Sequence, residues 1–203
     1  NYGESAISGG MIKAHLLGNM WAQSWENIFD LVVPYPEQPP QDATQGILDK
    51  GWNAVDMVKF AEQFFTGLGL TPFPDSFYTK SMFTKPTGKE VICHASAWDI
   101  AHEDVRIKMC INLNEEDLIV IHHESGHISY YLEYANQTAL FRTGANDGFH
   151  EALGDTIALS ITPEYLYNAG LLNSFNYQNE KDTINQLLRQ GLSKIAFLPF
   201  GLL

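Results

Sequence analysis

Two short motifs in this chain have the residue types and the spacing of a metal site. Residues 122–127 read HHESGH, in which His123 and His127 stand four positions apart and Glu124 follows the first of them. In an α-helix, residues four apart project from one face, so two imidazoles can converge on one Zn²⁺ while Glu124 reaches a water molecule on the ion. This spacing predicts a zinc hydrolase.

A second, acidic motif follows at residues 148–155, which read GFHEALGD. A catalytic zinc ion takes three protein ligands and keeps a fourth position open. Glu151 is the natural third ligand, because it lies in an apolar run with helical character. Asp155 lies one turn further on, where its carboxylate can accept the free ring N–H of a ligating histidine and fix the orientation of that ring.

The HExxH pattern alone is weak evidence, since so short a motif also arises by chance and a lone histidine on a helix is more often structural. The flanking residues 118–121 and 128–132 are largely apolar and indicate a buried helix. Two histidines and a glutamate are costly to bury there unless they are paired or bind a metal. The flanking sequence therefore favours the metal site.

Five stretches of the chain, in this order, resemble the signatures of the angiotensin-converting enzyme family of zinc peptidyl-dipeptidases. They are AHLLGNMWAQSW at 14–25, CHASAWD at 93–99, HHESGHISYY at 122–131, GANDGFHEALGD at 144–155 and KIAFLPF at 194–200. The resemblance implies that His123, His127 and Glu151 bind zinc and that Glu124 is the general base and acid. The implied fold is mainly α, a zincin-type helical metallopeptidase with a short β-hairpin or small sheet beside the HExxH helix.

The resemblance also implies which residues hold the peptide substrate. His94, with the backbone of Ala95 and Ala97, would hold it extended, and main-chain pairing of this kind supplies affinity without demanding one sequence. Gln23 would help to bind the terminal carboxylate, where the carboxypeptidase branch of the family has an Arg that shortens the pocket. The predicted reaction is therefore release of C-terminal dipeptides. The alternatives are a single-residue metallocarboxypeptidase and a catalytically silent relative that binds partners.

Two apolar residues are further candidates for the substrate pocket. Phe197 matches an aromatic residue of the family that lines the pocket for the last substrate side chain, and Val120 lies beside the zinc motif. Core packing is the competing explanation for both. Thr143, Asp147 and Ser193 stand where the family commonly has an acidic residue, a Pro and an Asp. These departures bear on pocket polarity and leave the zinc ligands intact.

The chain has two cysteines, Cys93 and Cys110, and the resemblance implies that they form a disulfide. Two buried free thiols are the alternative. Because a disulfide requires an oxidising compartment, the protein is predicted to be secreted or a membrane-anchored ectodomain, or periplasmic if bacterial. Asn136 opens the triplet NQT, which is an acceptor for N-glycosylation in secreted proteins.

The composition narrows the expected partners. Lys and Arg number 12 against 24 Asp and Glu, which gives a formal net charge of −12 and argues against nucleic-acid binding. No apolar run approaches the roughly 18 residues of a membrane span, so no membrane contact is expected within this segment. The expected partners are oligopeptides with a free C-terminus. The expected cofactor is Zn²⁺, and the resemblance allows for chloride in the full-length protein.

At 203 residues the chain is long enough for one domain with a real core. The family's catalytic domain is far longer, so the resemblance implies that residues 1–203 cover roughly its middle third. The predicted organisation is a partial single catalytic peptidase domain, truncated at both ends.

Local patterns predict the elements that position these motifs. Helices are expected at 16–25, at 47–68, from a cap at Asn114 through the zinc motif, at 147–160, and at 182–197 with a break at Pro199. A proline-rich loop is expected at 33–40. Strands are expected at 89–97 and 105–113, joined by a polar turn at 102–104. If these strands pair, a disulfide would tie the ends of the hairpin.

Overall fold

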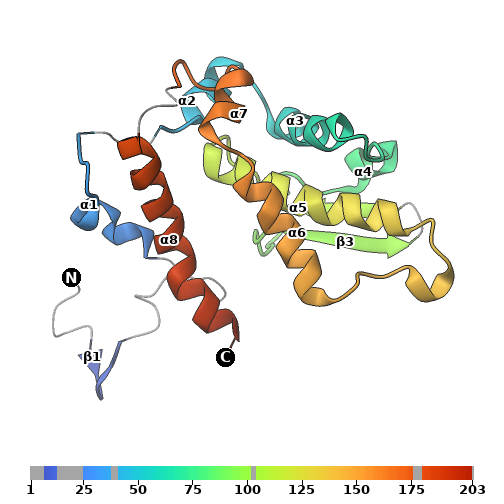
Figure 1. Ribbon diagram of the computed structural model, residues 1–203. Helices are drawn as coiled ribbons and strands as arrows, with labels where there is room; N and C mark the ends of the chain where they lie inside the picture. Colours follow the sequence, from blue (N-terminus) through green and yellow to red (C-terminus); the bar gives the residue numbers. More distant parts are fainter. Residues whose placement is uncertain (1–6, 13–24, 38–40, 102–103, 176–179, 203) are drawn as a thin grey trace. The chain divides into compact units, whose positions relative to one another are not determined.

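The computed structural model of the chain describes residues 7–12, 25–37, 41–101, 104–175 and 180–202 (Figure 1). It is mainly helical, with two antiparallel strand pairs among these residues, which confirms the predicted fold class. The elements in chain order are β1 (Ile7–Ser8), β2 (Met11–Ile12), η3 (Glu26–Ile28), α1 (Phe29–Val32), α2 (Thr44–Asp49), α3 (Ala54–Gly67), α4 (Asp75–Lys80), β3 (Ser96–Ala101), β4 (Asp104–Lys108), α5 (Glu115–Tyr134), η4 (Ala139–Phe141), α6 (Asp147–Leu159), α7 (Pro163–Asn168) and α8 (Glu180–Leu202).

The chain divides into two compact units. One comprises residues 1–41 and 176–203, and the other comprises residues 42–175, which contain both metal motifs. Within the first unit, α8 packs against η3 and α1. The Trp25 N–H donates to the Leu192 carbonyl at 3.0 Å, and the Arg189 guanidinium lies 5.1 Å from the centroid of the Phe29 ring. A single catalytic domain over the whole chain stays a prediction.

Helix α5 is the centre of the second unit, where it contacts α3, α6, β3 and β4 (Figure 1). As expected, Asn114 caps it, since its side chain accepts the Asp117 N–H at 2.8 Å. Glu115, Glu116 and Asp117 occupy the first turn, where the helix dipole favours negative charge. The cap fixes where the helix begins and therefore which face carries the zinc motif.

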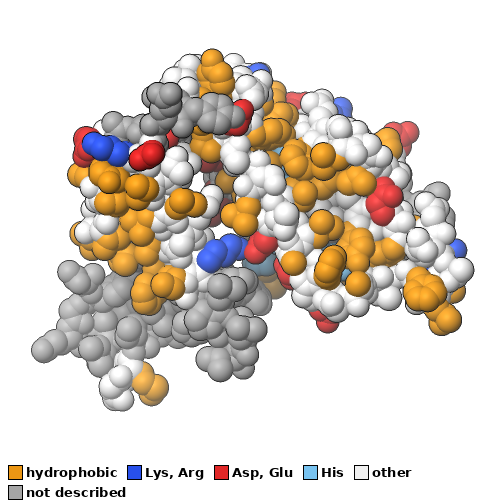
Figure 2. All heavy atoms as spheres, viewed as in Figure 1, with side chains coloured by type: hydrophobic (Ala, Val, Ile, Leu, Met, Phe, Trp, Pro, Cys, Tyr) orange, Lys and Arg blue, Asp and Glu red, His pale blue; other side chains and the backbone are white. Residues whose placement is uncertain are grey.

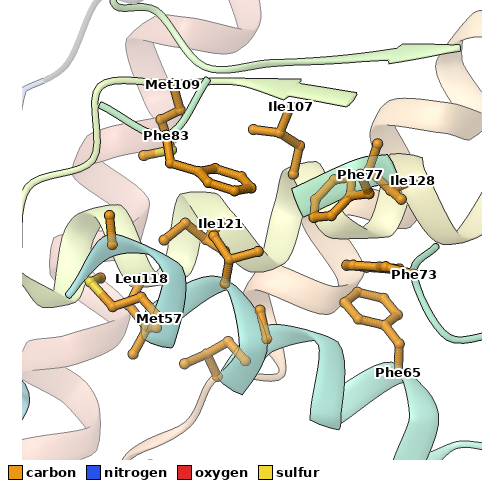
Figure 3. Close-up of a cluster of buried hydrophobic side chains, with 14 of the residues drawn as sticks. Met57, Phe65, Phe73, Phe77, Phe83, Ile107, Met109, Leu118, Ile121 and Ile128 are labelled. Atoms are coloured by element: carbon orange, nitrogen blue, oxygen red, sulfur yellow. The ribbon is translucent and has the colours of Figure 1, made fainter. Parts of the chain in front are cut away.

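A continuous apolar core holds α5 in place (Figure 3). It lies between α3, α4, α5 and the β3–β4 pair with its flanking segments. The labelled side chains are all buried, and they are Met57, Phe65, Phe73, Phe77, Phe83, Ile107, Met109, Leu118, Ile121 and Ile128. Burial of such side chains is the main favourable contribution to folding. The core holds the face of α5 that carries Leu118, Ile121 and Ile128, so the metal motif lies on another face of the helix.

The helix predicted at 47–68 is wrong in one respect, because the structure has two helices there. Gly51 adopts a φ of +65°, which is a left-handed conformation that ends α2. Asn53 then starts α3 with a capping box, in which its side chain accepts the Asp56 N–H and the Asp56 carboxylate accepts the Asn53 N–H. The predicted stop at its C-terminal end is correct, since α3 ends at Gly67.

The hairpin exists, but its strands are shifted from the predicted ranges. Strands β3 and β4 pair from Ser96–Lys108 to Ala101–Asp104, whereas residues 89–95 are irregular. Val105 and Ile107 are buried on β4, so the side that faces the core sets the register. Met109 pairs instead with the segment before β3, where its N–H donates to the Met82 carbonyl at 2.8 Å.

Three other predicted elements have mixed outcomes. The predicted helix at 147–160 is confirmed within one residue by α6. The helix predicted at 16–25 falls almost wholly on residues 13–24, which lie outside the described residues. The break expected at Pro199 is wrong, because α8 extends to Leu202. A proline in a helix removes one backbone hydrogen bond and bends the helix without necessarily ending it.

The first histidine of the HHExxH run, His122, is a core residue. It is fully buried on α5, and its Nδ1–H donates to the Leu118 carbonyl at 2.7 Å. Its ring packs edge-on against Phe60, Phe64 and Tyr165, with centroids 5.8–6.0 Å away. Burial lowers the pKa of His122 to about 4. The neutral imidazole therefore belongs to the folded state.

Acid should destabilise the metal-free protein through His122. Because the pKa falls from 6.5 in the unfolded chain to about 4 in the folded one, the unfolded state binds the proton more tightly. This contribution to stability is present above pH 6.5 and is lost as the pH falls toward 4, by about 2 kcal/mol between pH 7 and pH 5. Urea unfolding of wild type and His122→Asn should differ in acid sensitivity by this amount. Equal acid sensitivity in both proteins would contradict the assignment.

Glycine at position 46 should be required for stability. A Cβ built on Gly46 in α2 would lie 2.1 Å from the carbonyl oxygen of Leu171, which follows α7. Gly46→Ala should therefore cost about 1–3 kcal/mol in the free energy of unfolding. Gly67→Ala is the matched control, because nothing lies within 4 Å of a Cβ there. It should leave stability unchanged or slightly raised. Equal urea midpoints for wild type and Gly46→Ala would refute the packing argument.

Candidate metal centre

The structure brings His123 and His127 of α5 together with Glu151 of α6. The two histidine Nε2 atoms are 3.1 Å apart, and Glu151 carboxylate oxygens lie 3.3 Å from the His123 Nε2 and 3.7 Å from the His127 Nε2. A tetrahedral zinc ion with bonds of about 2.0–2.1 Å holds its ligand atoms about 3.3–3.4 Å apart. The donor types and their separations therefore fit one zinc ion.

Glycines allow the two helices to approach closely enough for this. A Cβ built on Gly126 would lie 3.3 Å from the Gly154 Cα, and one built on Gly154 would lie 2.8 Å from ring atoms of His123. The α6 backbone thus lies directly against α5 and its histidine, where any side chain at position 154 would collide. Because α6 is this close, Glu151 reaches the same point as the two imidazoles.

Each histidine of the pair also has a partner on its other ring nitrogen. The predicted partner Asp155 lies 3.2 Å from the Nδ1 of His123. The Nδ1 of His127 lies 3.0 Å from the Nδ1 of His150, a residue that the sequence motifs did not single out. His150 directly precedes Glu151, but its pairing depends on how two helices cross, and spacing within one motif carries no signal of that.

The charges around the pair favour a cation. Burial lowers the pKa of His123, but the hydrogen bond that its ring donates to Asp155 and the charges of the Glu124, Glu151 and Asp155 carboxylates outweigh burial and raise that pKa above its ordinary value. Burial and the neighbouring His123 lower the pKa of His127 to about 4. The surrounding carboxylates therefore favour positive charge at this pair, as a site for a metal ion requires.

Glu124 lies beside the metal ligands, and its side chain is shielded from water. The residue is 7% exposed, and burial is the main reason that its pKa rises to about 7. The N–H of Ala97 in β3 donates to its carboxylate, which lowers the pKa in part. A cation at the ligands would also favour the charged form. A carboxyl group with a pKa near neutral can both take and return a proton.

The predicted substrate strand runs beside α5. The Ala97 carbonyl accepts the Tyr131 hydroxyl at 3.5 Å, so both main-chain groups of Ala97 are bonded to α5 side chains. His94 is exposed, and its Nδ1–H donates to the Ala95 carbonyl at 2.8 Å. Ala95 packs against the core. A role for these residues in holding substrate stays a prediction.

The remaining predicted pocket residues are not brought to the centre by the described structure. Gln23 lies outside the described residues, as does the side chain of Phe197. Val120 is half-buried and packs against the apolar core, which agrees with the packing explanation. Roles for these residues in substrate binding stay predictions.

A disulfide joins Cys93 to Cys110, with Cα atoms 5.0 Å apart. It closes the base of the β3–β4 pair just outside the ladder, next to His94. In the chain-entropy model, a disulfide that closes a loop of this length stabilises the folded protein by about 3 kcal/mol. The disulfide therefore restrains the segment that leads from His94 into β3.

Asn136, the predicted glycosylation site, is exposed in the turn that follows α5.

Helix α6 lies at the surface of its unit. Glu151 has 71% of its side chain exposed, against 19% for His123 and 9% for His127, so the candidate site is open on the side of Glu151. Large apolar side chains are also exposed on α6 and before it, namely Leu140, Phe141, Phe149 and Leu159, and Figure 2 shows apolar side chains across the surface of this unit. None of the helices in the described ranges has the length and hydropathy of a membrane span.

Comparisons with known proteins agree with this site. The family model described as angiotensin-converting enzyme matches residues 1–203. The chain is 54% identical to angiotensin-converting enzyme of Bos taurus over 206 residues, which cover the whole chain and 16% of that protein. It is 47% identical to the enzyme of Theromyzon tessulatum and 45% identical to that of Haematobia irritans exigua, over 32% and 33% of their lengths. The chain thus spans a third or less of the length of each of these relatives. Because the family model matches its whole length, the chain belongs to the angiotensin-converting enzyme family of metallopeptidases.

Proposed function

We propose that the protein containing this chain is a zinc peptidyl-dipeptidase, which releases dipeptides from the free C-terminus of oligopeptides. The observation that carries the proposal is the meeting of His123, His127 and Glu151 within 4.8 Å, with the buried Glu124 beside them. Membership of the family supports the same reaction class. All three ligands and the acid–base residue are present, which argues against a catalytically silent relative.

In the proposed site, His123 and His127 bind Zn²⁺ through Nε2, and Glu151 binds it through its carboxylate. Bound zinc would polarise the substrate carbonyl and lower the pKa of a water molecule. Glu124 then takes the proton from the attacking water and returns it to the leaving amine. Its burial suits it to both steps, because its pKa lies near neutral. Asp155 holds the ring of His123 in place for this reaction.

The substrate is proposed to lie extended along β3. His94 and the main chain of Ala95 and Ala97 would pair with its backbone, so that many sequences could bind. To pair with Ala97, the substrate would have to replace the hydrogen bonds that Ala97 makes to the α5 side chains. Gln23 is proposed to help bind the terminal carboxylate. Phe197 and Val120 are proposed to line the pocket for the last side chain.

The cellular compartment and the modification of the protein are also proposals. The Cys93–Cys110 disulfide supports an oxidising compartment, and we propose a secreted protein or the ectodomain of an anchored one. The exposed position of Asn136 supports glycosylation there. Chloride is proposed as a ligand of the full-length protein, on the family resemblance alone.

Glu124→Gln should separate metal binding from proton transfer. The full-length variant should keep one zinc ion per site, because Glu124 is not among the three ligands. It should lose about 10²–10⁴-fold in kcat, because an amide cannot accept the proton. Metal analysis and turnover of a peptide substrate provide the two readouts.

His127→Ala is the control for that experiment, since it should lose both zinc and activity. Near-normal kcat in a zinc-loaded Glu124→Gln protein would refute the role of Glu124. Stoichiometric zinc in His127→Ala would refute the ligand set.

Gln23→Arg should shift cleavage from dipeptides toward single residues. An Arg would bring both bulk and a fixed charge toward the substrate carboxylate and shorten the pocket. Digestion of an N-terminally blocked tetrapeptide by the full-length protein, with identification of the products, should show dipeptides from wild type and single residues from the variant. If the variant still releases only dipeptides at an unchanged rate, another residue sets the length of the product. Single residues from wild type would favour a metallocarboxypeptidase.

A further inference from the structure

We propose that His150 is a positioning residue for the metal ligand His127, whose Nδ1–H it accepts and whose Nε2 it thereby keeps directed at the ion. The inference rests on the proposed zinc site. The observation that supports it is the 3.0 Å separation between the Nδ1 atoms of His127 on α5 and His150 on α6.

Zinc bound at the Nε2 of His127 would determine the direction of this hydrogen bond. A neutral imidazole carries its proton on one nitrogen, and a metal occupies the lone pair of the other. When His127 binds zinc through Nε2, its Nδ1 must carry the proton and needs an acceptor. The structure places the Nδ1 of His150 at that point, so His150 must be neutral with its own proton on Nε2.

The ring of His150 is held rigidly enough to orient another side chain. Its centroid lies 4.6 Å from that of Tyr130 and 4.9 Å from that of Tyr131. A Cβ built on Gly144 would lie 2.6 Å from the Cδ2 of His150, so the loop before α6 closes directly against the ring. The Tyr130 hydroxyl accepts the Ala145 N–H at 3.0 Å and fixes this loop.

The two ligating histidines thus receive different partners from the same helix. His123 faces the carboxylate of Asp155, whereas His127 faces a neutral ring. The carboxylates of Glu124, Glu151 and Asp155 already surround the pair. A neutral acceptor orients the second ligand without adding a fourth negative charge beside the buried Glu124. Both partners are carried by α6, so the helix that supplies Glu151 also orients both histidines.

Two substitutions separate the hydrogen bond from the packing of the ring. His150→Phe keeps an aromatic ring among the tyrosines but has no acceptor. His150→Asn loses the ring but places an amide oxygen at the same number of bonds from the backbone as Nδ1. Phe149→Ala is the matched control on α6, because Phe149 is 57% exposed. The zinc dissociation constant of each full-length protein is measured by competition with a chromophoric chelator, and the melting temperature of each metal-free protein is the folding control.

We expect His150→Phe to bind zinc about 10–100-fold more weakly than wild type, as is typical when the hydrogen-bond partner of a metal ligand is lost. His150→Asn should recover most of this loss, and Phe149→Ala should match wild type. Wild-type affinity in folded His150→Phe would overturn the proposal. Equal losses in His150→Phe and His150→Asn would also overturn it, since packing alone would then explain them.

A second measurement does not depend on how the variants fold. In zinc-loaded wild type labelled with ¹⁵N-histidine, the ring-nitrogen chemical shifts should show the proton of His150 on Nε2 and that of His127 on Nδ1. A proton on the Nδ1 of His150 would overturn the proposal. Absence of zinc from the wild-type protein would instead refute the proposed zinc site, so the two failures are distinguishable.

Discussion

The close crossing of α5 and α6 at Gly126 and Gly154 is the constraint on which the candidate site depends. A Cβ on Gly126 would lie 3.3 Å from the Gly154 Cα, and a Cβ on Gly154 would lie 2.8 Å from the His123 ring. Neither position therefore tolerates a larger residue unless its neighbours move. At this separation, one helix supplies two imidazoles and the other supplies Glu151 to the same point. A wider crossing would leave the histidines paired with each other and the carboxylate out of reach of a shared ion.

The same proximity sets the electrostatics of the centre. Glu124, Glu151 and Asp155 gather around two imidazoles on a helix whose opposite face is in the core. These neighbouring carboxylates repel one another, and burial favours the protonated form of Glu124, whereas a cation between them stabilises all three. The same carboxylates raise the pKa of His123 and so favour positive charge on its ring. Because a histidine must give up its proton to bind a metal through that nitrogen, metal binding and protonation compete at this site.

The sequence predicted those features of the structure that residues close together in the chain determine, and it missed those that depend on distant contacts. The zinc motif, the cap at Asn114 and the stop near Gly67 follow from residues a few positions apart, and the structure has each of them. The division at Gly51 was missed because apolar periodicity continues across it. The extent of β3 was missed because burial of β4 residues sets the register. His150 was missed because its partner lies 23 positions away on another helix.

One residue, Ala97, connects the proposed substrate strand to the proposed acid–base residue. Its N–H donates to Glu124, and its carbonyl accepts the Tyr131 hydroxyl. The disulfide at the base of the hairpin restrains the chain that leads to Ala97. The N–H of Ala97 favours the charged form of Glu124, so a substrate that pairs with this N–H would remove part of that stabilisation. The proton affinity of Glu124 would then rise when substrate is bound, at the stage when it must take a proton from water. The proposed pairing of substrate along β3 would therefore be coupled to the basicity of Glu124 through the N–H of Ala97.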